Sequence, residues 1–436
     1  FFEKEFSRSG FNSARQQIKQ RLYAVLSIPT FDRLFSAPKS KINFFDALNS
    51  GKIILIDTAK GLLKDEGTAI FGRFMLALIE HAISERANIP EAERNPVFLY
   101  MDEAHEDFQR AESPRTFRFP DDHGPHPQFK IEWWYITGNL TSQQQRHFGF
   151  QMTFFRFALS PQQIQRDSHW ANNQMYMAHF SITDVASAKF HYFQRLSRAT
   201  LGLAGAQTQP FKVWLYDWAL KSETQDFLPL SLSAQDNDIK IKLNFQSEKP
   251  LILQGINGLS QKSSTPGKAS YYYSLTRLLT SGQIQVGKTT HQVTGLSWLD
   301  REWSTSPLAK NQIGWDWFAL QLSNQQEIMF YQIRQKNGQA TPMNRGTYVY
   351  RDGRTTPLLH SEVNIKVLKY WTSKTGITYP NAWQVSIPKH EIQLSITPYI
   401  ANQEINLSMR YWEGAVDVSG TREGIEISGR GYVELT

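Results

Sequence analysis

The sequence predicts a mainly β protein with two antiparallel β-barrels, preceded by a partial α/β segment. Three observations support this fold class. Helical and buried-strand patterns alternate before about residue 110, short strands dominate after it, and turn residues separate those strands at regular intervals. The β-rich part of the 436-residue chain is also too long for one small barrel, so two barrels fit it better.

The composition is that of a globular, aromatic-rich chain. Aromatic residues make up 13% of it, which is enough ring area for large cores or ring-lined cavities. The net charge is +7, but lysine and arginine are scattered, so we expect a solvated basic surface and no nucleic-acid partner. The absence of cysteine excludes disulfides and thiolate metal sites. No apolar run reaches the roughly 18 residues of a membrane-spanning helix.

The first part of the chain predicts a strand–helix–strand unit. Residues 12–24 have a helical pattern, and residues 52–57 (KIILID) form a continuous apolar run, as in strands buried on both faces. Residues 69–87 carry apolar side chains at helical spacing, and VFLYM at 97–101 predicts a second buried strand. A strand, a helix and a strand in this order imply a parallel sheet.

The second of these strands ends in acidic residues. In VFLYMDEAHE, residues 97–106, Asp102 would hold Mg²⁺ and Glu103 would polarise an attacking water, as in a Walker B strand. Residues 52–106 resemble the core of HerA-like and conjugation-coupling P-loop ATPases. The chain has no G-x-x-x-x-G-K-[ST] loop, however, so the phosphates would lack their backbone cradle. We therefore expect residues 1–108 to be a truncated ATPase-like fragment, in which these acids cap a strand, and not an ATP-dependent DNA motor.

The second part of the chain predicts a series of short antiparallel strands. Their patterns lie at residues 138–140, 149–157, 174–183, 212–218, 239–246, 271–279 and 292–299, and then at 315–322, 327–336, 346–350, 363–372, 383–387, 392–399, 414–420 and 429–435. Such spacing favours a barrel or a sandwich, and spacing alone does not separate the two.

Motifs in this part resemble one known family. They are RFPDDHGPHPQFKIEWWYITGNL at 118–140, GFQMTFFR at 149–156, MAHF at 177–180, WLDREW at 298–303, GWDW at 314–317 and the ending RYWEGAVDVSG…GRGYVEL. They are similar to the carotenoid 1,2-hydratase family, which includes the AttH-type lipocalin-like proteins, and lie closer to the AttH branch. The resemblance implies two lipocalin-like β-barrels packed together, which we place at residues 117–302 and 303–436, after a linker at 109–116.

The resemblance also implies two alternative functions. The first, which we expect, is binding of an apolar lipid- or terpenoid-like ligand, in association with an ABC export system. The alternative is a hydro-lyase of the carotenoid 1,2-hydratase kind, which adds water to an isoprenoid C=C bond. Family members are usually exported to the periplasm or the membrane surface, but no signal-peptide pattern is visible, so the sequence leaves the compartment open. It also leaves the oligomeric state open.

A hydratase needs an acid that stays protonated, and Asp300 fits that need. A carboxyl in an apolar pocket keeps its proton, and aromatic faces stabilise the carbocation that protonation creates. The hydratases carry Tyr-x-Asp here, whereas this chain has Trp298 in the aromatic position, and its residues 270–279 lack their His-x-Trp pair. Alternation places Trp298, Asp300 and Glu302 on one strand face and Arg301 on the other. A structural acid at the barrel rim is the alternative role for Asp300.

The predicted ligand-binding residues are the aromatic side chains of these motifs: Trp133, Trp134, Tyr135, Tyr272, Trp303, Trp315 and Trp317. Of the two adjacent tryptophans, one should face the cavity or core and the other the interface between the barrels. Glu132, a charge among tryptophans, is expected to be paired with arginine or backbone N–H groups. His123, His126 and His179 suggest a metal site, but the glycine and prolines around the first two favour a rigid loop. We expect neither a metal nor a cofactor.

Overall fold

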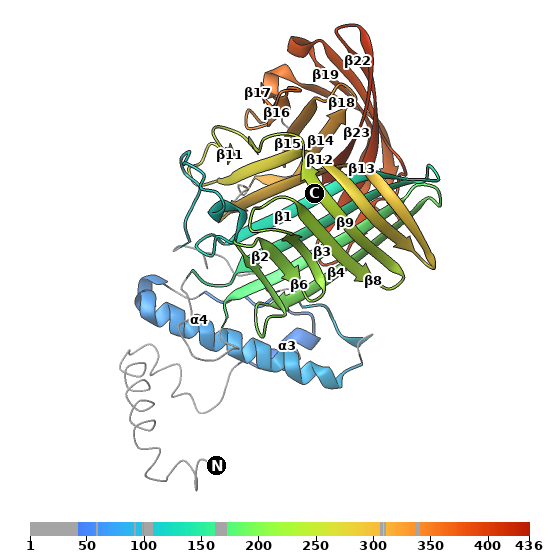
Figure 1. Ribbon diagram of the computed structural model, residues 1–436. Coiled ribbons are helices and arrows are strands. Elements are labelled where there is room, and N and C mark those ends of the chain that lie inside the picture. Colours follow the sequence, from blue (N-terminus) through green and yellow to red (C-terminus); the bar gives the residue numbers. More distant parts are fainter. Residues whose placement is uncertain are drawn as a thin grey trace, which may run out of the picture. The chain divides into compact units, whose positions relative to one another are not determined.

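The computed structural model describes residues 42–57, 60–90, 93–97, 99, 108–161, 172–305, 308, 311–336 and 341–436. The chain divides into two compact units, Phe1–Asp102 and Glu103–Thr436. The described part of the first unit is helical, and that of the second is built mainly from β-strands (Figure 1). Within the described ranges, no helix combines the length and the apolar character that a membrane crossing requires.

The described part of the first unit contains α3 (Phe44–Asn49), α4 (Lys60–Glu85) and the short 3₁₀ helix η2 (Arg86–Asn88). Asn43 caps α3, because its side-chain oxygen accepts a hydrogen bond from the backbone N–H of Asp46 at 3.2 Å. The helix expected at residues 69–87 is found within α4 and η2. Apolar side chains of both α-helices form a small core of Phe44, Leu48, Met75, Ile79 and Ala82.

The prediction of a strand at residues 52–57 is wrong. These residues are not in a strand, and Ile53 and Leu55 are 89% and 91% exposed. Ile54 and Ile56 pack against the helical core, so the run buries one side only. No described strand lies beside it to complete a sheet. The apolar run therefore does not form the expected βαβ unit.

The rest of the expected ATPase-like fragment is not shown either. In the run 97–101, Val97 and Leu99 are described and neither is in a strand. The helix expected at 12–24 and the acids Asp102 and Glu103 lie outside the described residues.

In the second unit, the described residues form a first sheet of 13 strands. Its main path runs in the order β4-β3-β2-β1-β13-β12-β9-β8-β7-β6-β5, and β10 and β11 pair with β12. The strands are β1 (Ile131–Ser142), β2 (His147–Ala158), β3 (Gln174–Asp184), β4 (Lys189–Arg198), β5 (Ala204–Gln207), β6 (Lys212–Leu215), β7 (Trp218–Ser222), β8 (Leu230–Asp236), β9 (Ile239–Ser247), β10 (Ile252–Leu253), β11 (Leu259–Gln261), β12 (Ala269–Val286) and β13 (Thr289–Ser304).

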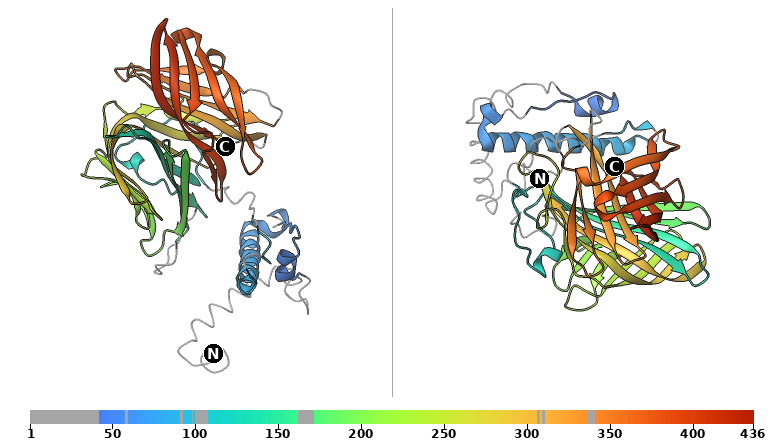
Figure 2. Two further views of the ribbon diagram at one scale, coloured as in Figure 1. Left: turned by 90° about the vertical axis from the view of Figure 1, so that its right-hand side faces the viewer. Right: turned by 90° about the horizontal axis from the view of Figure 1, so that it is seen from above.

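The first sheet curls into a nearly closed barrel (Figure 2). The two ends of the strand order meet, since β3 contacts β5 and β4 contacts β6. Inward-facing apolar side chains fill the interior with a continuous core that includes Trp134, Phe150, Phe180, Trp218 and Phe245. A ligand held inside this barrel, as a lipocalin-like fold would suggest, would therefore find the space occupied by the protein's own side chains.

The second sheet has ten strands in the described residues, in the order β17-β16-β15-β14-β23-β22-β20-β19-β18, with β21 paired to β22. It forms a half-barrel around its own core (Figure 2). Its strands are β14 (Gln312–Leu322), β15 (Glu327–Gln335), β16 (Arg345–Val349), β17 (Thr355–Leu359), β18 (Asn364–Thr372), β19 (Thr378–Ile387), β20 (Ile392–Pro398), β21 (Glu404–Asn406), β22 (Arg410–Arg422) and β23 (Ile425–Leu435). The short 3₁₀ helices of the unit are η4 (Asp121–His123), η5 (His360–Glu362) and η6 (Pro388–His390).

The two barrel-like sheets expected from the strand spacing are confirmed, although some strands, such as β4 and β8, were not expected and one expected strand is divided. Residues 212–218, expected as one strand, form the hairpin β6–β7, in which Leu215 pairs with Trp218. Tyr216 occupies the turn with a φ of 57°, in the left-handed region that reverses the chain tightly.

The two sheets pack against each other through an interface cluster, formed by Tyr135, Tyr272, Trp298, Trp317, Ala319, Met329, Tyr331, Ile333, Ala415 and Tyr432. The sheets approach each other closely at Gly149 of β2, where an added Cβ would lie 2.5 Å from the Cβ of Ala415 and 2.8 Å from the hydroxyl of Tyr432. Glycine therefore lets β2 and the second sheet touch here.

A buried ion cluster also joins the sheets. Glu327 of β15 is fully buried and accepts hydrogen bonds from Lys249 Nζ at 2.7 Å and from Arg277 Nε, on β12, at 2.5 Å. The carboxylate of Glu327 belongs to the second sheet, and both cations belong to the part of the chain that forms the first sheet. The cluster therefore fixes one sheet to the other.

Candidate active site

A cavity of about 360 Å³ lies between the two sheets. Its walls come from β1, β2, β12 and β13 of the first sheet and from β14, β15, β22 and β23 of the second. Aromatic rings dominate the lining: Trp133, Tyr135, Phe155, Tyr272, Trp315, Trp317, Tyr331 and Tyr411. An apolar cavity with a few polar groups is the usual form of a small-molecule site.

Strand alternation explains which motif residues reach the cavity. On β1, Trp133 and Tyr135 line it, whereas Trp134 between them points into the barrel core. β13 runs antiparallel beside β1, with Tyr135 opposite Asp300 and Trp133 opposite Glu302. Both acids line the cavity, so the two sequence motifs present their alternate residues to one space.

Asp300 is a buried carboxyl in this wall, 4% exposed. Its Oδ1 accepts hydrogen bonds from Ser274 Oγ at 2.5 Å and Trp298 Nε1 at 2.7 Å, and its Oδ2 from Tyr272 Oη at 2.6 Å. Burial raises the pKa of Asp300 to about 7, although these hydrogen bonds oppose the shift. The carboxyl is therefore about half protonated at neutral pH.

Glu302, the next residue on the same strand face, has a different environment. Lys262 Nζ lies 3.5 Å from Glu302 Oε1 and 4.0 Å from the centre of the Tyr331 ring. Burial alone would lower the pKa of Lys262, but the charge of Glu302 raises it above the usual value. Glu302 and Lys262 thus form an ion pair at the cavity.

The second sheet contributes a carboxyl that the sequence analysis missed. Glu434 on β23 lines the cavity and accepts a hydrogen bond from Trp315 Nε1 at 2.8 Å. Burial raises the pKa of Glu434 to about 7. The signal that could have found it is an acid inside the apolar ending YVEL, on a strand that otherwise reads as buried.

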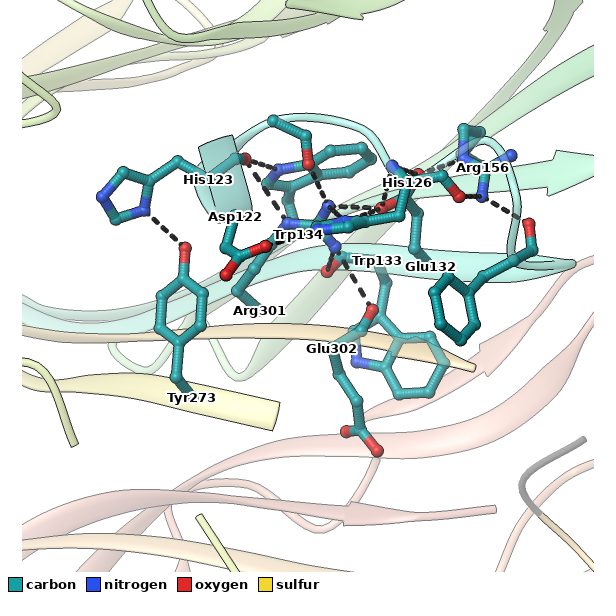
Figure 3. A network of polar contacts seen from close by, with 12 residues as sticks. Asp122, His123, His126, Glu132, Trp133, Trp134, Arg156, Tyr273, Arg301 and Glu302 are labelled. Atoms are coloured by element: carbon teal, nitrogen blue, oxygen red, sulfur yellow. Dashed lines mark hydrogen bonds and ion pairs between the residues drawn. The ribbon is translucent and has the colours of Figure 1, made fainter. Parts of the chain in front are cut away.

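Glu132 is a buried, paired carboxylate on the opposite face of the same strands (Figure 3). It accepts hydrogen bonds from the guanidinium groups of Arg156 and Arg301 and, at 2.9 Å, from the backbone N–H of His126. Burial alone would raise the pKa of Glu132, but Arg156 and Arg301 hold it well below its usual value. Arg301 also stacks over Trp134, 3.9 Å from the ring centre. This network lies away from the cavity and joins β1, β2 and β13.

The three histidines have separate partners. His123 Nδ1 lies 2.6 Å from Tyr273 Oη, His126 stacks on Trp303 at 3.8 Å between ring centres, and His179 Nδ1 lies 2.8 Å from Tyr411 Oη. Burial lowers the pKa of His123 to about 3 and that of His179 to about 4. In the described ranges, no three His, Cys, Asp or Glu residues gather as metal ligands would.

The structure thus brings most of the sequence-predicted site residues together. Asp300 lines the cavity with Trp133, Tyr135, Tyr272, Trp315 and Trp317. Trp298 bonds to Asp300 and packs in the interface cluster, without lining the cavity. Trp134 and Trp303 lie elsewhere, in the barrel core and in a separate cluster around Phe129 and Tyr273.

Comparison with known proteins fits this architecture. Residues 110–436 match the model of the AttH-like family. The chain belongs to the AttH-like family. A solved AttH-like relative, a putative AttH from Nitrosomonas europaea, is 35% identical to it, with a TM-score of 0.66 over 74% of this chain and 98% of the relative.

Two more distant matches to this AttH-like chain, one in fold and one in sequence, have enzyme names. Kievitone hydratase from Nectria haematococca shares its fold, with 16% identity and a TM-score of 0.59 over 76% of this chain and 96% of the other. The curated relative dehydratase asqC from Emericella nidulans is 20% identical over 281 residues, covering 62% of this chain and 79% of that protein.

Proposed function

We propose that this chain is a hydro-lyase, which adds water to, or removes it from, an apolar substrate bound in the cavity between the sheets. The observation that carries the proposal is Asp300, a carboxyl that burial keeps partly protonated at neutral pH inside an aromatic-lined cavity. A general acid works best when its pKa is near the working pH.

The surroundings of Asp300 suit the protonation of a carbon–carbon double bond. Addition of a proton to an alkene produces a carbocation at the neighbouring carbon, and the aromatic lining, which includes Trp133, Trp317 and Tyr135, supplies ring quadrupoles that can stabilise such a charge. Loss of water from an alcohol follows the same path in reverse.

The hydrogen bonds of Asp300 also fix where its proton sits. Trp298 Nε1 can only donate and occupies Oδ1, so the proton of neutral Asp300 belongs on Oδ2, and Tyr272 Oη then accepts from Oδ2, whereas it donates to the ionised carboxylate. Burial raises the pKa of Tyr272 well above its usual value, so the phenol stays neutral and can pass a proton onward. In the hydratase motif Tyr-x-Asp, a tyrosine stands where this chain has Trp298. Here Tyr272, on β12, supplies a phenol beside the aspartate instead.

The relatives support the reaction class and leave the substrate open. Two proteins of similar fold or sequence are a hydratase and a dehydratase by name. The departures from the carotenoid hydratase pattern, Trp298 and the missing His-x-Trp pair, give no support to a carotenoid end group in particular. The proposal is therefore water addition or elimination on an apolar substrate of the isoprenoid kind.

The test incubates the full chain with lycopene, or with kievitone, in heavy-oxygen water. We expect a product that has gained one labelled water by mass spectrometry. The variant Asp300→Asn should lower the rate by about 10²–10⁴-fold, the usual contribution of a general acid. Asp417→Asn, which changes an exposed aspartate of β22 outside the cavity, is the matched control and should match the wild type.

Binding without chemistry is the second candidate, and the apolar lining of the cavity favours it equally. Native mass spectrometry separates the two: recovery of the bound probe unchanged from both wild type and Asp300→Asn would support a carrier and refute the hydro-lyase. The association with an ABC export system follows from the family resemblance alone, and co-purification with exporter components would test it.

A further inference from the structure

Two glutamates lie side by side on the second sheet. One of them lines the cavity and the other lies behind it. Glu413 on β22 and Glu434 on β23 are direct cross-strand partners. Opposite residues of antiparallel strands point to the same face and hold their Cβ atoms about 5 Å apart. Two carboxylates at this separation in a buried site repel each other strongly, so they cannot both be ionised without a counter-charge.

The two carboxyls differ in their access to the cavity. Glu413 is fully buried, and its Oε1 accepts a hydrogen bond from Tyr135 Oη at 2.7 Å. Its Oε2 has no hydrogen-bond partner within the described ranges. A buried anionic oxygen without a donor is costly, whereas a neutral carboxyl is tolerated. Burial and the neighbouring Glu434 accordingly raise the pKa of Glu413 well above its usual value.

Glu434 is the member of the pair that reaches the cavity. It is partly exposed there, and Trp315 Nε1 donates to its Oε1 at 2.8 Å. An indole N–H can only donate, so Glu434 Oε1 is an acceptor in this bond. Its pKa of about 7 places the loss of the proton in the neutral range.

We propose that Glu434 is the second catalytic carboxyl of this cavity, the base that takes the proton from the attacking water, and that Glu413 stays protonated behind it. The inference rests on the proposed hydro-lyase function. It assigns the acid to the first sheet, on Asp300, and the base to the second, on Glu434.

The reaction balances with these two groups alone. The π electrons of the double bond take the proton of Asp300, through Tyr272, and form a C–H bond, which leaves a carbocation and the Asp300 carboxylate. The oxygen of water forms the C–O bond, and its released proton goes to the Glu434 carboxylate. After product release, Glu434 returns its proton to solvent and Asp300 regains one, so the net change is alkene plus water to alcohol.

The other charged groups around the cavity are less suited to the role of base. Glu302 is paired with Lys262, and Glu413 does not line the cavity. Arg410 also lines it and is a cation. Three acids therefore surround Glu434: Asp300, Glu302 and Glu413. Lys262 neutralises Glu302. The placement of the two carboxyls in different walls separates their roles: Asp300 accepts hydrogen bonds from Tyr272 and Ser274 of its own sheet, whereas Glu434 lines the opposite wall.

The first experiment needs no substrate. NMR of the full chain with isotope-labelled glutamate carboxyl carbons should show one side-chain carboxyl that titrates near neutral pH. This signal should be absent in Glu434→Gln and present in Glu413→Gln, which mimics the protonated form. A Glu434 signal that titrates in the ordinary acidic range, or one that disappears in Glu413→Gln, would overturn the division of roles within the pair.

The second experiment uses the lycopene and kievitone assay. Glu434→Gln should lower kcat by about 10²–10⁴-fold with little change in KM, as loss of a general base does. Its pH profile should lose the acidic limb, whereas the control Asp417→Asn, outside the cavity, should keep both the rate and the profile. If Asp300→Asn is inactive and a folded Glu434→Gln matches the wild type, the assignment of Glu434 as the base is wrong and the hydro-lyase proposal stands. If the wild type converts neither probe, the hydro-lyase proposal fails for those substrates, and the NMR titration alone decides the state of the pair.

Discussion

Substitution of Glu132 by glutamine tests whether the network of Figure 3 holds the first sheet together. The side chains of Glu132, Arg156 and Arg301 are 0%, 1% and 0% exposed, so glutamine leaves two guanidinium groups buried without their shared counter-charge. The amide would also point an N–H group at one of these donors. Removal of one partner from a buried ion pair costs about 3–5 kcal/mol, and we expect the free energy of unfolding to fall by that amount.

Urea unfolding followed by tryptophan fluorescence measures this change, and the control is Asp352→Asn. Asp352 pairs with Arg354 on the surface, where both side chains are more than half exposed, so its loss should hardly change stability. The pKa of Glu132 is depressed, so its stabilisation is present above the ordinary glutamate pKa and is lost as the pH falls through the folded value. The gap between wild type and Glu132→Gln should therefore shrink in acid. Equal urea midpoints for Glu132→Gln and Asp352→Asn at neutral pH would refute the argument.

Three further predictions concern the packing of the sheets and the cavity. Gly149→Val should lower the free energy of unfolding by about 1–3 kcal/mol, because its side chain would collide with Ala415; calorimetry that shows no loss would contradict the close approach. Arg277→Met should cost about 3 kcal/mol in urea unfolding, since Glu327 loses one of its two buried cations, and a neutral effect would show that the ion cluster does not fix the sheets. The pKa of Asp300 is raised, so between about pH 4 and 7 the native state holds a proton that the unfolded state has released. The free energy of unfolding therefore falls as the pH rises through that window. Asp300→Asn should make this fall smaller, while Glu434, whose pKa is also raised to about 7, still contributes its own part; a stability–pH curve identical to that of the wild type would be the contrary result.

Local strand patterns predicted the fold of the second unit because side chains alternate between faces with a period of two. In WLDREW, alternation placed Asp300 and Glu302 on one face and Arg301 on the other, and the structure has them so. The same rule separated Trp133 from Trp134. Strands with more polar or half-exposed patterns, such as β4 and β8, were not predicted.

The failures come from information that a local pattern does not contain. The run at 52–57 is apolar enough for a buried strand, but a strand also needs a neighbour, which the described residues do not provide. Glu434 meets Asp300 at one cavity although they belong to different sheets and lie far apart in the sequence, so no spacing rule links them. The site lies between the sheets, and not inside a barrel, because the barrel interior is already filled by its own rings.

The walls of the cavity come from two sheets, so the pKa of Asp300 depends on the packing of one sheet against the other. Asp300 keeps its proton near neutral pH because the second sheet shields it from water. If the sheets separated by the width of a water layer, solvation would return its acidity to that of an ordinary surface aspartate. Under the proposed function, neither half of the molecule contains a reaction centre by itself, and expression of the two sheets as separate chains should restore one only when they dock.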